Sequence, residues 1–137
     1  MDLELIMKEM DKLNYGWMDI NNELHINSID NIQKLYRLSS IEEILKNKAG
    51  ICFDQVELER YIFKDYYETN SYALITRNMV HAFIMLEKDN QFIYFEHSSY
   101  KNKGIYYFNR KEDLLDYALK SFINLHNIKD ISKVKVV

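Results

Sequence analysis

The sequence predicts an α+β fold in which a central helix carries a cysteine at its N-terminus and packs on a mostly antiparallel β-sheet. Two observations lead to this prediction. Apolar residues recur at helical spacing in the first half of the chain and again near its end, whereas residues 72–108 hold short β-rich runs separated by turn residues. The only cysteine, Cys52, follows a glycine that separates two helical patterns.

Length and composition predict one domain spanning residues 1–137. Apolar residues make up 47% of the chain and aromatic residues 14%, which is enough to bury a core. The net charge of −3, with acids and bases interspersed, argues against a nucleic-acid partner. The oligomeric state stays open.

The same composition bears on localisation. No apolar run approaches the roughly 18 residues that cross a membrane, and the acidic start does not resemble a signal peptide, so we expect no membrane partner. A lone cysteine suits a reducing cytoplasm, where we place the protein. The absence of proline, with many Asn, Ile, Lys and Tyr residues, indicates an AT-rich bacterial or phage genome.

The first 38 residues predict a helix followed by less regular structure. Residues 2–14 have one apolar helical face, and Gly16 is the expected C-terminal cap. Residues 24–26 fit a short strand or a loop, and residues 29–36 fit a short helix. The apolar positions of the first helix are Leu3, Ile6, Met7, Met10 and Leu13.

Two helices flank Gly50. Ser39 and Ser40, each with a glutamate three residues later, form a capping-box pattern that predicts a helix over residues 41–48. The next helix is expected to run from near Cys52 to about residue 67. Its predicted buried residues are Val56, Leu58, Tyr61, Ile62 and Phe63, and its predicted exposed residues are Glu57, Glu59, Arg60 and Lys64.

The second half predicts strands and one further helix. Asn109 is the expected N-cap of a helix over residues 111–126, and residues 134–137 fit an edge strand. The strands are expected at residues 72–76, 81–86, 92–96 and 105–108.

Three residues suggest a thiol acyl-transfer site. Cys52 lies in the first turn of a helix, where the helix dipole favours the nucleophilic thiolate. His81 begins one predicted strand, and Glu96 ends the next. We expect Cys52 to attack a carbonyl group. His81 would take the thiol proton and later protonate the leaving group, and Glu96 would orient the imidazole.

The register of the predicted hairpin decides whether Glu96 reaches His81. If residue 86 pairs with residue 91, Glu96 lies opposite His81. A slip by two residues leaves Glu96 diagonal to His81 on the same face, and a slip by one puts His97 in its place. Two of these three registers therefore place Glu96 beside His81.

These residues carry a family resemblance. The run Gly50-Ile51-Cys52-Phe53-Asp54, followed by His81-Ala82-Phe83 and a later acid, resembles the transglutaminase-like branch of the papain-like cysteine enzymes over roughly residues 39–108. The resemblance implies a cysteine peptidase, amidase or acyltransferase that acts on a peptide or protein-amide substrate. It implies neither a metal nor an organic cofactor.

An acyl-transfer site also needs two donors for the oxyanion. The backbone N–H of Cys52 belongs to the free end of the helix and is expected to supply one. Trp17, Asn14 and Gln33 are the upstream candidates for the second donor.

Other functions stay open. Val80 stands where the family often has glycine, and Glu96 where aspartate is usual, which favours a second hypothesis of an inactive module that binds a peptide or protein partner. A third, arylamine N-acetyltransferase-like chemistry, belongs to usually longer chains. Cys52, His81, Glu96 and His97 are zinc-ligand types, but no paired ligand spacing occurs, and neighbours in a strand point apart. We expect His97 to face solvent.

Overall fold

A five-stranded antiparallel sheet is the frame of the fold in the computed structural model, which describes residues 1–137. The strand order is β7-β6-β5-β4-β8, so hairpin-connected strands lie side by side. The predicted α+β class and the antiparallel pairing are confirmed. The strands are β4 (Glu68–Ile75), β5 (Val80–Lys88), β6 (Gln91–Glu96), β7 (Gly104–Phe108) and β8 (Lys135–Val136).

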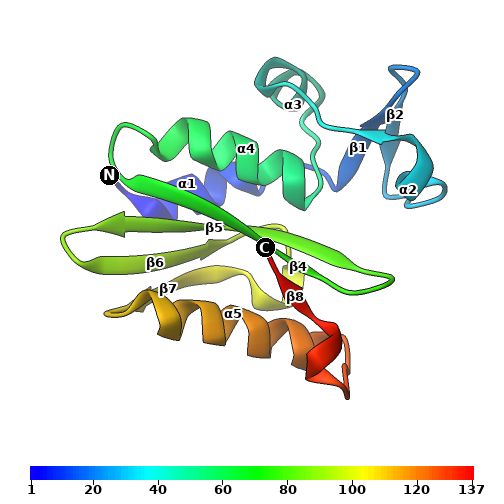
Figure 1. The fold of residues 1–137 in the computed structure, drawn as a ribbon. Coiled ribbons are helices and arrows are strands. Elements are labelled where there is room, and N and C mark those ends of the chain that lie inside the picture. The colour runs from blue at the N-terminus through cyan, green and yellow to red at the C-terminus, as the bar shows by residue number, and fades with distance from the viewer.

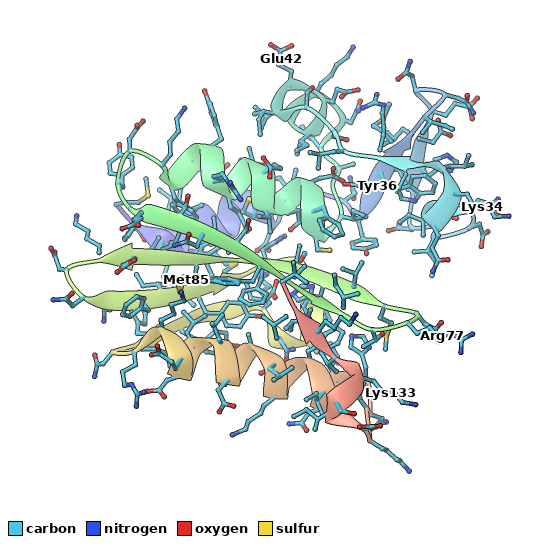
Figure 2. All side chains as sticks on the ribbon, in the orientation of Figure 1. Lys34, Tyr36, Glu42, Arg77, Met85 and Lys133 are labelled. Atoms are coloured by element: carbon cyan, nitrogen blue, oxygen red, sulfur yellow. The ribbon has the colours of Figure 1, made fainter.

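Helices cover both faces of this sheet (Figure 1). Because side chains alternate along a strand, Ile84 and Leu86 of β5 pack against α1 and α4, whereas Phe83 and Met85 pack towards α5. Met85 is labelled in the layer between the sheet and α5 (Figure 2). The helices are α1 (Leu3–Met10), α4 (Cys52–Phe63) and α5 (Lys111–Leu125).

A smaller sheet lies beside the N-terminal end of α4 (Figure 1). Its three antiparallel strands have the order β2-β1-β3. Arg37 makes two hydrogen bonds to the Glu43 carboxylate, 2.9 and 2.7 Å long, and these tie β3 to α3. The elements of this region are β1 (Gly16–Asp19), β2 (Leu24–Ile26), α2 (Ile32–Leu35), β3 (Tyr36–Arg37) and α3 (Ile41–Asn47).

Several local predictions are confirmed. Ser40 and Glu43 form the capping box of α3, and residues 24–26 form a strand. The edge strand near the C-terminus is β8. None of the helices has the length and apolar character that a membrane-spanning helix needs.

The predicted role of Gly16 is wrong. Helix α1 already ends at Met10 with Asp11 as its C-cap, and Gly16 opens β1 opposite Ile26. A Cβ atom on Gly16 would lie 2.6 Å from Ile26 Cδ1 and 2.8 Å from the His25 carbonyl oxygen. The glycine therefore permits the close approach of β1 and β2.

Helix α4 differs from the prediction in its length and in its buried face. It ends at Phe63 rather than near residue 67. Tyr61 is 55% exposed, whereas Glu59, expected to face water, is only 3% exposed. The buried face includes Cys52, Val56, Glu59 and Phe63, which recur at helical spacing and therefore lie on one side.

The start of α5 also differs. Arg110 precedes the helix as N-cap and makes no side-chain capping bond, so the prediction of Asn109 as the cap is wrong. The acidic residues Glu112 and Asp113 occupy its first turn instead, where they interact favourably with the helix dipole.

Replacing Gly16 by alanine should destabilise the protein, because the added methyl group overlaps both Ile26 and the His25 backbone. We expect a loss of about 1–3 kcal/mol in the free energy of unfolding, measured by urea denaturation. The control is Gly50→Ala, whose nearest contact would be Asp54 Cβ at 3.0 Å and whose effect should be smaller. Equal effects in the two variants would contradict this account of Gly16.

Candidate active site at the start of helix α4

The backbone that precedes Cys52 is held at every polar group. Gly50 and Ile51 offer two N–H groups and two carbonyl oxygens, and all four are hydrogen-bonded. Because nothing in this dipeptide is free to rotate without breaking a bond, the position of Cys52 is set by its surroundings. The bonds are Gly50 N to Asn14 O (3.1 Å), Gln55 Nε2 to Gly50 O (2.9 Å), Ile51 N to Asp54 Oδ2 (3.0 Å) and Gln55 N to Ile51 O (2.9 Å).

Asp54 connects this loop to the smaller sheet. Its carboxylate is fully buried and accepts hydrogen bonds from the Tyr36 hydroxyl (2.9 Å), the Ser39 N–H (3.0 Å) and the Ile51 N–H (3.0 Å). Burial raises the pKa of Asp54, and these three bonds act against that rise. The sequence indicated only a favourable interaction with the helix dipole, because Tyr36 and Ser39 are distant in the chain.

Cys52 lies at a cleft of about 620 Å³. The side chain is largely buried and packs with Val56 and Ala82. One wall of the cleft is formed by residues 29–34 and another by residues 78–80, with His126 of the segment after α5 also lining it. In Figure 2, Lys34 marks the first wall and Arg77 the tip of the β4–β5 hairpin beside the second.

Glu96 holds the ring of His81. The His81 Nε2–H donates to Glu96 Oε1, and the Tyr94 hydroxyl donates to the same oxygen over 2.7 Å. The other oxygen accepts from the Ser98 hydroxyl (3.3 Å) and the Ser99 N–H (3.2 Å). This carboxylate is only 2% exposed, so the four bonds compensate for its removal from water. They leave Nδ1 of His81 as the nitrogen available to the thiol.

The observed register is the one slipped by two residues. Lys88 pairs with Gln91, and continuing this pairing places Glu96 diagonal to His81 on the same face of the sheet. The expectation that Glu96 lies beside His81 is confirmed.

The thiol and the imidazole meet where β5 begins. His81 is in phase with Phe83, on which its ring stacks at 6.3 Å, whereas Cys52 contacts the intervening Ala82 from the side of α4. No well-aligned hydrogen bond joins the Cys52 sulfur to the ring. Catalytic hydrogen bonds are often long or poorly aligned before substrate binds.

Electrostatics favour a protonated His81. Burial alone would lower its pKa, but the side chains of Cys52 and Glu96 outweigh burial and raise the pKa of His81 to about 10. Burial, with the nearby negative charge of Glu96, raises the pKa of Glu59 well above its ordinary value. Of these two carboxylates, Glu96 is the one that is hydrogen-bonded to the His81 ring and favours its positive charge.

His97 does not face solvent, so that expectation is wrong. Its side chain is only 9% exposed. Nδ1 lies 2.7 Å from Gln55 Oε1, and Nε2 lies 2.9 Å from Asp11 Oδ1. Glu96 and His97 thus point to opposite sides of the sheet, as alternation requires, and bind different partners.

The three candidates for the second oxyanion donor differ in whether their N–H groups are already hydrogen-bonded elsewhere. Trp17 is a wrong prediction, because its indole N–H already donates to the Ser28 carbonyl oxygen over 2.6 Å. The side-chain amide of Asn14 donates to the Lys48 carbonyl oxygen over 3.3 Å. Gln33 lines the cleft together with Cys52.

Tyr15 also lines the cleft, and the sequence analysis missed it. Burial raises the pKa of its phenol, and the negative charges of Cys52 and Asp54 add to the effect. The hydroxyl therefore keeps its proton and can donate it in a hydrogen bond. The residues around Tyr15 in the sequence do not distinguish it from the other tyrosines, of which the chain has 11 in all.

A second cluster of potential ligands lies in the smaller sheet. Oxygen and nitrogen atoms of Asp19, Glu23 and His25 lie within 4.8 Å of one another. Asp19 already accepts from the Asn21 N–H (2.8 Å), the Glu23 N–H (2.9 Å) and the His25 ring (2.8 Å). The His25 ring also stacks on Trp17, with 4.1 Å between centroids. These contacts explain the cluster as the structure of the β1–β2 turn.

Comparison of the chain with family models, with curated proteins and with solved structures finds no match.

The pKa of His81 gives a direct prediction. Its ring resonances in NMR spectra should titrate near pH 10 rather than near 6.5, and Glu96→Gln should shift the midpoint downwards, because the variant loses the negative charge that holds the proton. A raised folded-state pKa also means that His81 stabilises the fold fully below about pH 6.5 and that this contribution is lost as the pH rises through about 10. A midpoint near 6.5 in the wild type would contradict the arrangement.

Asp54→Asn should destabilise the protein, because an amide cannot accept from Tyr36, Ser39 and Ile51 at once and so leaves a buried donor unpaired. We expect a loss of about 1–3 kcal/mol in urea denaturation. Glu57→Gln, the same change of charge on the same helix at a partly exposed position, is the control and should have little effect. The role of Asp54 is refuted if both variants unfold at the wild-type urea concentration.

Proposed function

We propose that the protein is a transglutaminase-like thiol enzyme that catalyses acyl transfer or amide hydrolysis on a peptide or protein-amide substrate. Cys52 is the nucleophile, His81 the proton carrier and Glu96 the residue that orients His81. The observation that carries the proposal is the imidazole of His81, which is bonded through Nε2 to a buried carboxylate and is close enough to Cys52 for that side chain to raise its pKa. A cleft beside the same cysteine provides room for substrate.

The chemistry follows from these positions. The Cys52 sulfur attacks the carbonyl carbon, and the thiol proton resides on Nδ1 of His81. Collapse of the tetrahedral intermediate breaks the bond to the leaving amine, which takes that proton. Water or a second amine then attacks the acyl thioester while His81 accepts its proton. Collapse of this second tetrahedral intermediate breaks the C–S bond and releases the acid or the new amide, and Cys52 and His81 return to their starting state.

The free end of α4 supplies part of the oxyanion site. The backbone N–H groups of Cys52 and Phe53 lie in the first turn, where no carbonyl of the helix can accept them. The Tyr15 hydroxyl or the Gln33 amide, both lining the cleft, supplies the remaining donor. This chemistry requires no cofactor, and the reduced thiol on which it depends suits the cytoplasm.

The test uses p-nitrophenyl acetate as a minimal acyl donor. We expect a burst of nitrophenolate from the wild type, with an acetyl group on Cys52 detected by mass spectrometry. Cys52→Ala should abolish the burst, and His81→Gln should slow it by about 10²–10⁴-fold because the proton carrier is lost. His25→Gln is the matched control, since His25 also pairs with a buried aspartate but lies in the smaller sheet, and it should react like the wild type.

A folded wild type that releases nitrophenolate no faster than Cys52→Ala would refute the enzyme. The second candidate, an inactive module that binds a peptide or protein partner, would then gain support. The exposed apolar side chains of Ile29 and Val80 at the cleft favour it. Binding of such a partner should survive both Cys52→Ala and His81→Ala.

A further inference from the structure

A chain of side chains runs from the loop before Cys52 to the end of α1. Gln55, almost fully buried, donates from Nε2 to the Gly50 carbonyl oxygen over 2.9 Å and faces His97 Nδ1 through Oε1 at 2.7 Å. On its other side, His97 Nε2 lies 2.9 Å from Asp11 Oδ1. Lys103 forms an ion pair with the same aspartate oxygen. Three segments that are distant in the sequence, near residues 11, 50–55 and 97–103, thus meet through these side chains.

The direction of each hydrogen bond follows from its ends. The Gly50 carbonyl can only accept, so the Gln55 amide must present its NH₂ group there and its oxygen to His97. His97 therefore donates through Nδ1. Hydrogen bonds from Lys103 and His97 lower the pKa of Asp11, so Asp11 is ionised and accepts from Nε2. With the chain complete, His97 donates at both nitrogens.

We propose that Gln55, His97 and Asp11 are positioning residues for the nucleophile. They act through the Gly50 carbonyl group on the dipeptide that carries Cys52, and they keep the thiol aligned with His81. This inference rests on the proposed function, because alignment matters only if His81 activates the thiol. None of the three side chains belongs to the Cys52–His81–Glu96 set, and none lines the cleft.

The hydrogen bonds of Gln55 and His97 act on the loop before Cys52 rather than on a helix or strand. Gln55 lies in the first turns of α4 and His97 directly after β6, and their side chains are hydrogen-bonded to each other. The bond from Gln55 reaches the one carbonyl oxygen in the Gly50–Ile51 dipeptide that no backbone group holds. Loss of the His97 bond would leave the Gln55 amide free to rotate, and Gly50 would then lose its side-chain donor.

Two substitutions of His97 distinguish an effect of these hydrogen bonds on Cys52 from a general loss of stability. His97→Asn keeps a donor where Nδ1 stood, facing Gln55, and gives up the bond to Asp11. His97→Gln reaches Asp11 and gives up the donor to Gln55. We measure the rate at which iodoacetamide alkylates Cys52 at neutral pH, which reports on one site because the chain has a single cysteine.

We expect His97→Asn to react within about twofold of the wild type and His97→Gln to react about fivefold more slowly, the effect of losing one hydrogen bond. In the His81→Gln background, His97→Gln should cause no further slowing, because the chain acts through alignment with His81. Equal rates for His97→Asn and His97→Gln would overturn the proposal, as would full additivity of the His97 and His81 substitutions.

A measurement on the intact wild type covers the case in which a variant does not fold. In ¹⁵N-resolved NMR spectra, Nδ1 of His97 should carry a hydrogen that exchanges slowly with water. An Nδ1 without a hydrogen would overturn the proposal, because His97 could not then donate to Gln55 Oε1. If instead the wild-type thiol reacts no faster than that of His81→Gln, the proposed enzyme fails, while the Nδ1–H result still decides whether His97 holds Gln55.

Discussion

A buried carboxylate that must be satisfied determines the geometry of this site. Glu96 ends β6 beneath the surface, and a carboxylate in such a place is stable only when its oxygens are hydrogen-bonded. Tyr94, Ser98 and Ser99 supply three of the bonds, and His81 supplies the fourth. The fourth bond fixes the orientation of the imidazole, and with it the nitrogen that is left for Cys52. The proton affinity of His81 then follows from the same contacts.

The start of α4 meets a similar constraint with different groups. Asp54, Gln55 and Glu59 are polar residues of α4 whose side chains are buried. Asp54 and Gln55 are hydrogen-bonded to backbone groups of Ser39, Gly50 and Ile51. These bonds compensate the buried polar atoms for the loss of water and also fix the loop before Cys52. The two halves of the site are therefore held independently, one by Glu96 and the other by these two side chains, and they meet at the start of β5.

Sequence patterns predicted the parts of this structure that depend on local spacing. Alternation along the β5–β6 hairpin put His81 and Glu96 on one face in two of three possible registers, and the structure has one of these two. The Ser40–Glu43 capping box located the start of α3. The failures share a cause. Gly16, Trp17 and His97 owe their roles to residues that are not their neighbours in a helix or strand pattern, such as Ile26, Ser28 and Gln55. Glu59 was assigned to solvent by its charge, although its helical position places it with Cys52 and Val56.

The proposed activity depends on His81, held by Glu96, activating the thiol of Cys52. The rate at which iodoacetamide alkylates Cys52 at neutral pH tests this dependence without any substrate, and His25→Gln is the matched control because His25 also pairs with a buried aspartate. The wild type and His25→Gln should react at the same rate, and His81→Gln should react much more slowly. A wild type that reacts no faster than His81→Gln would refute the role of His81.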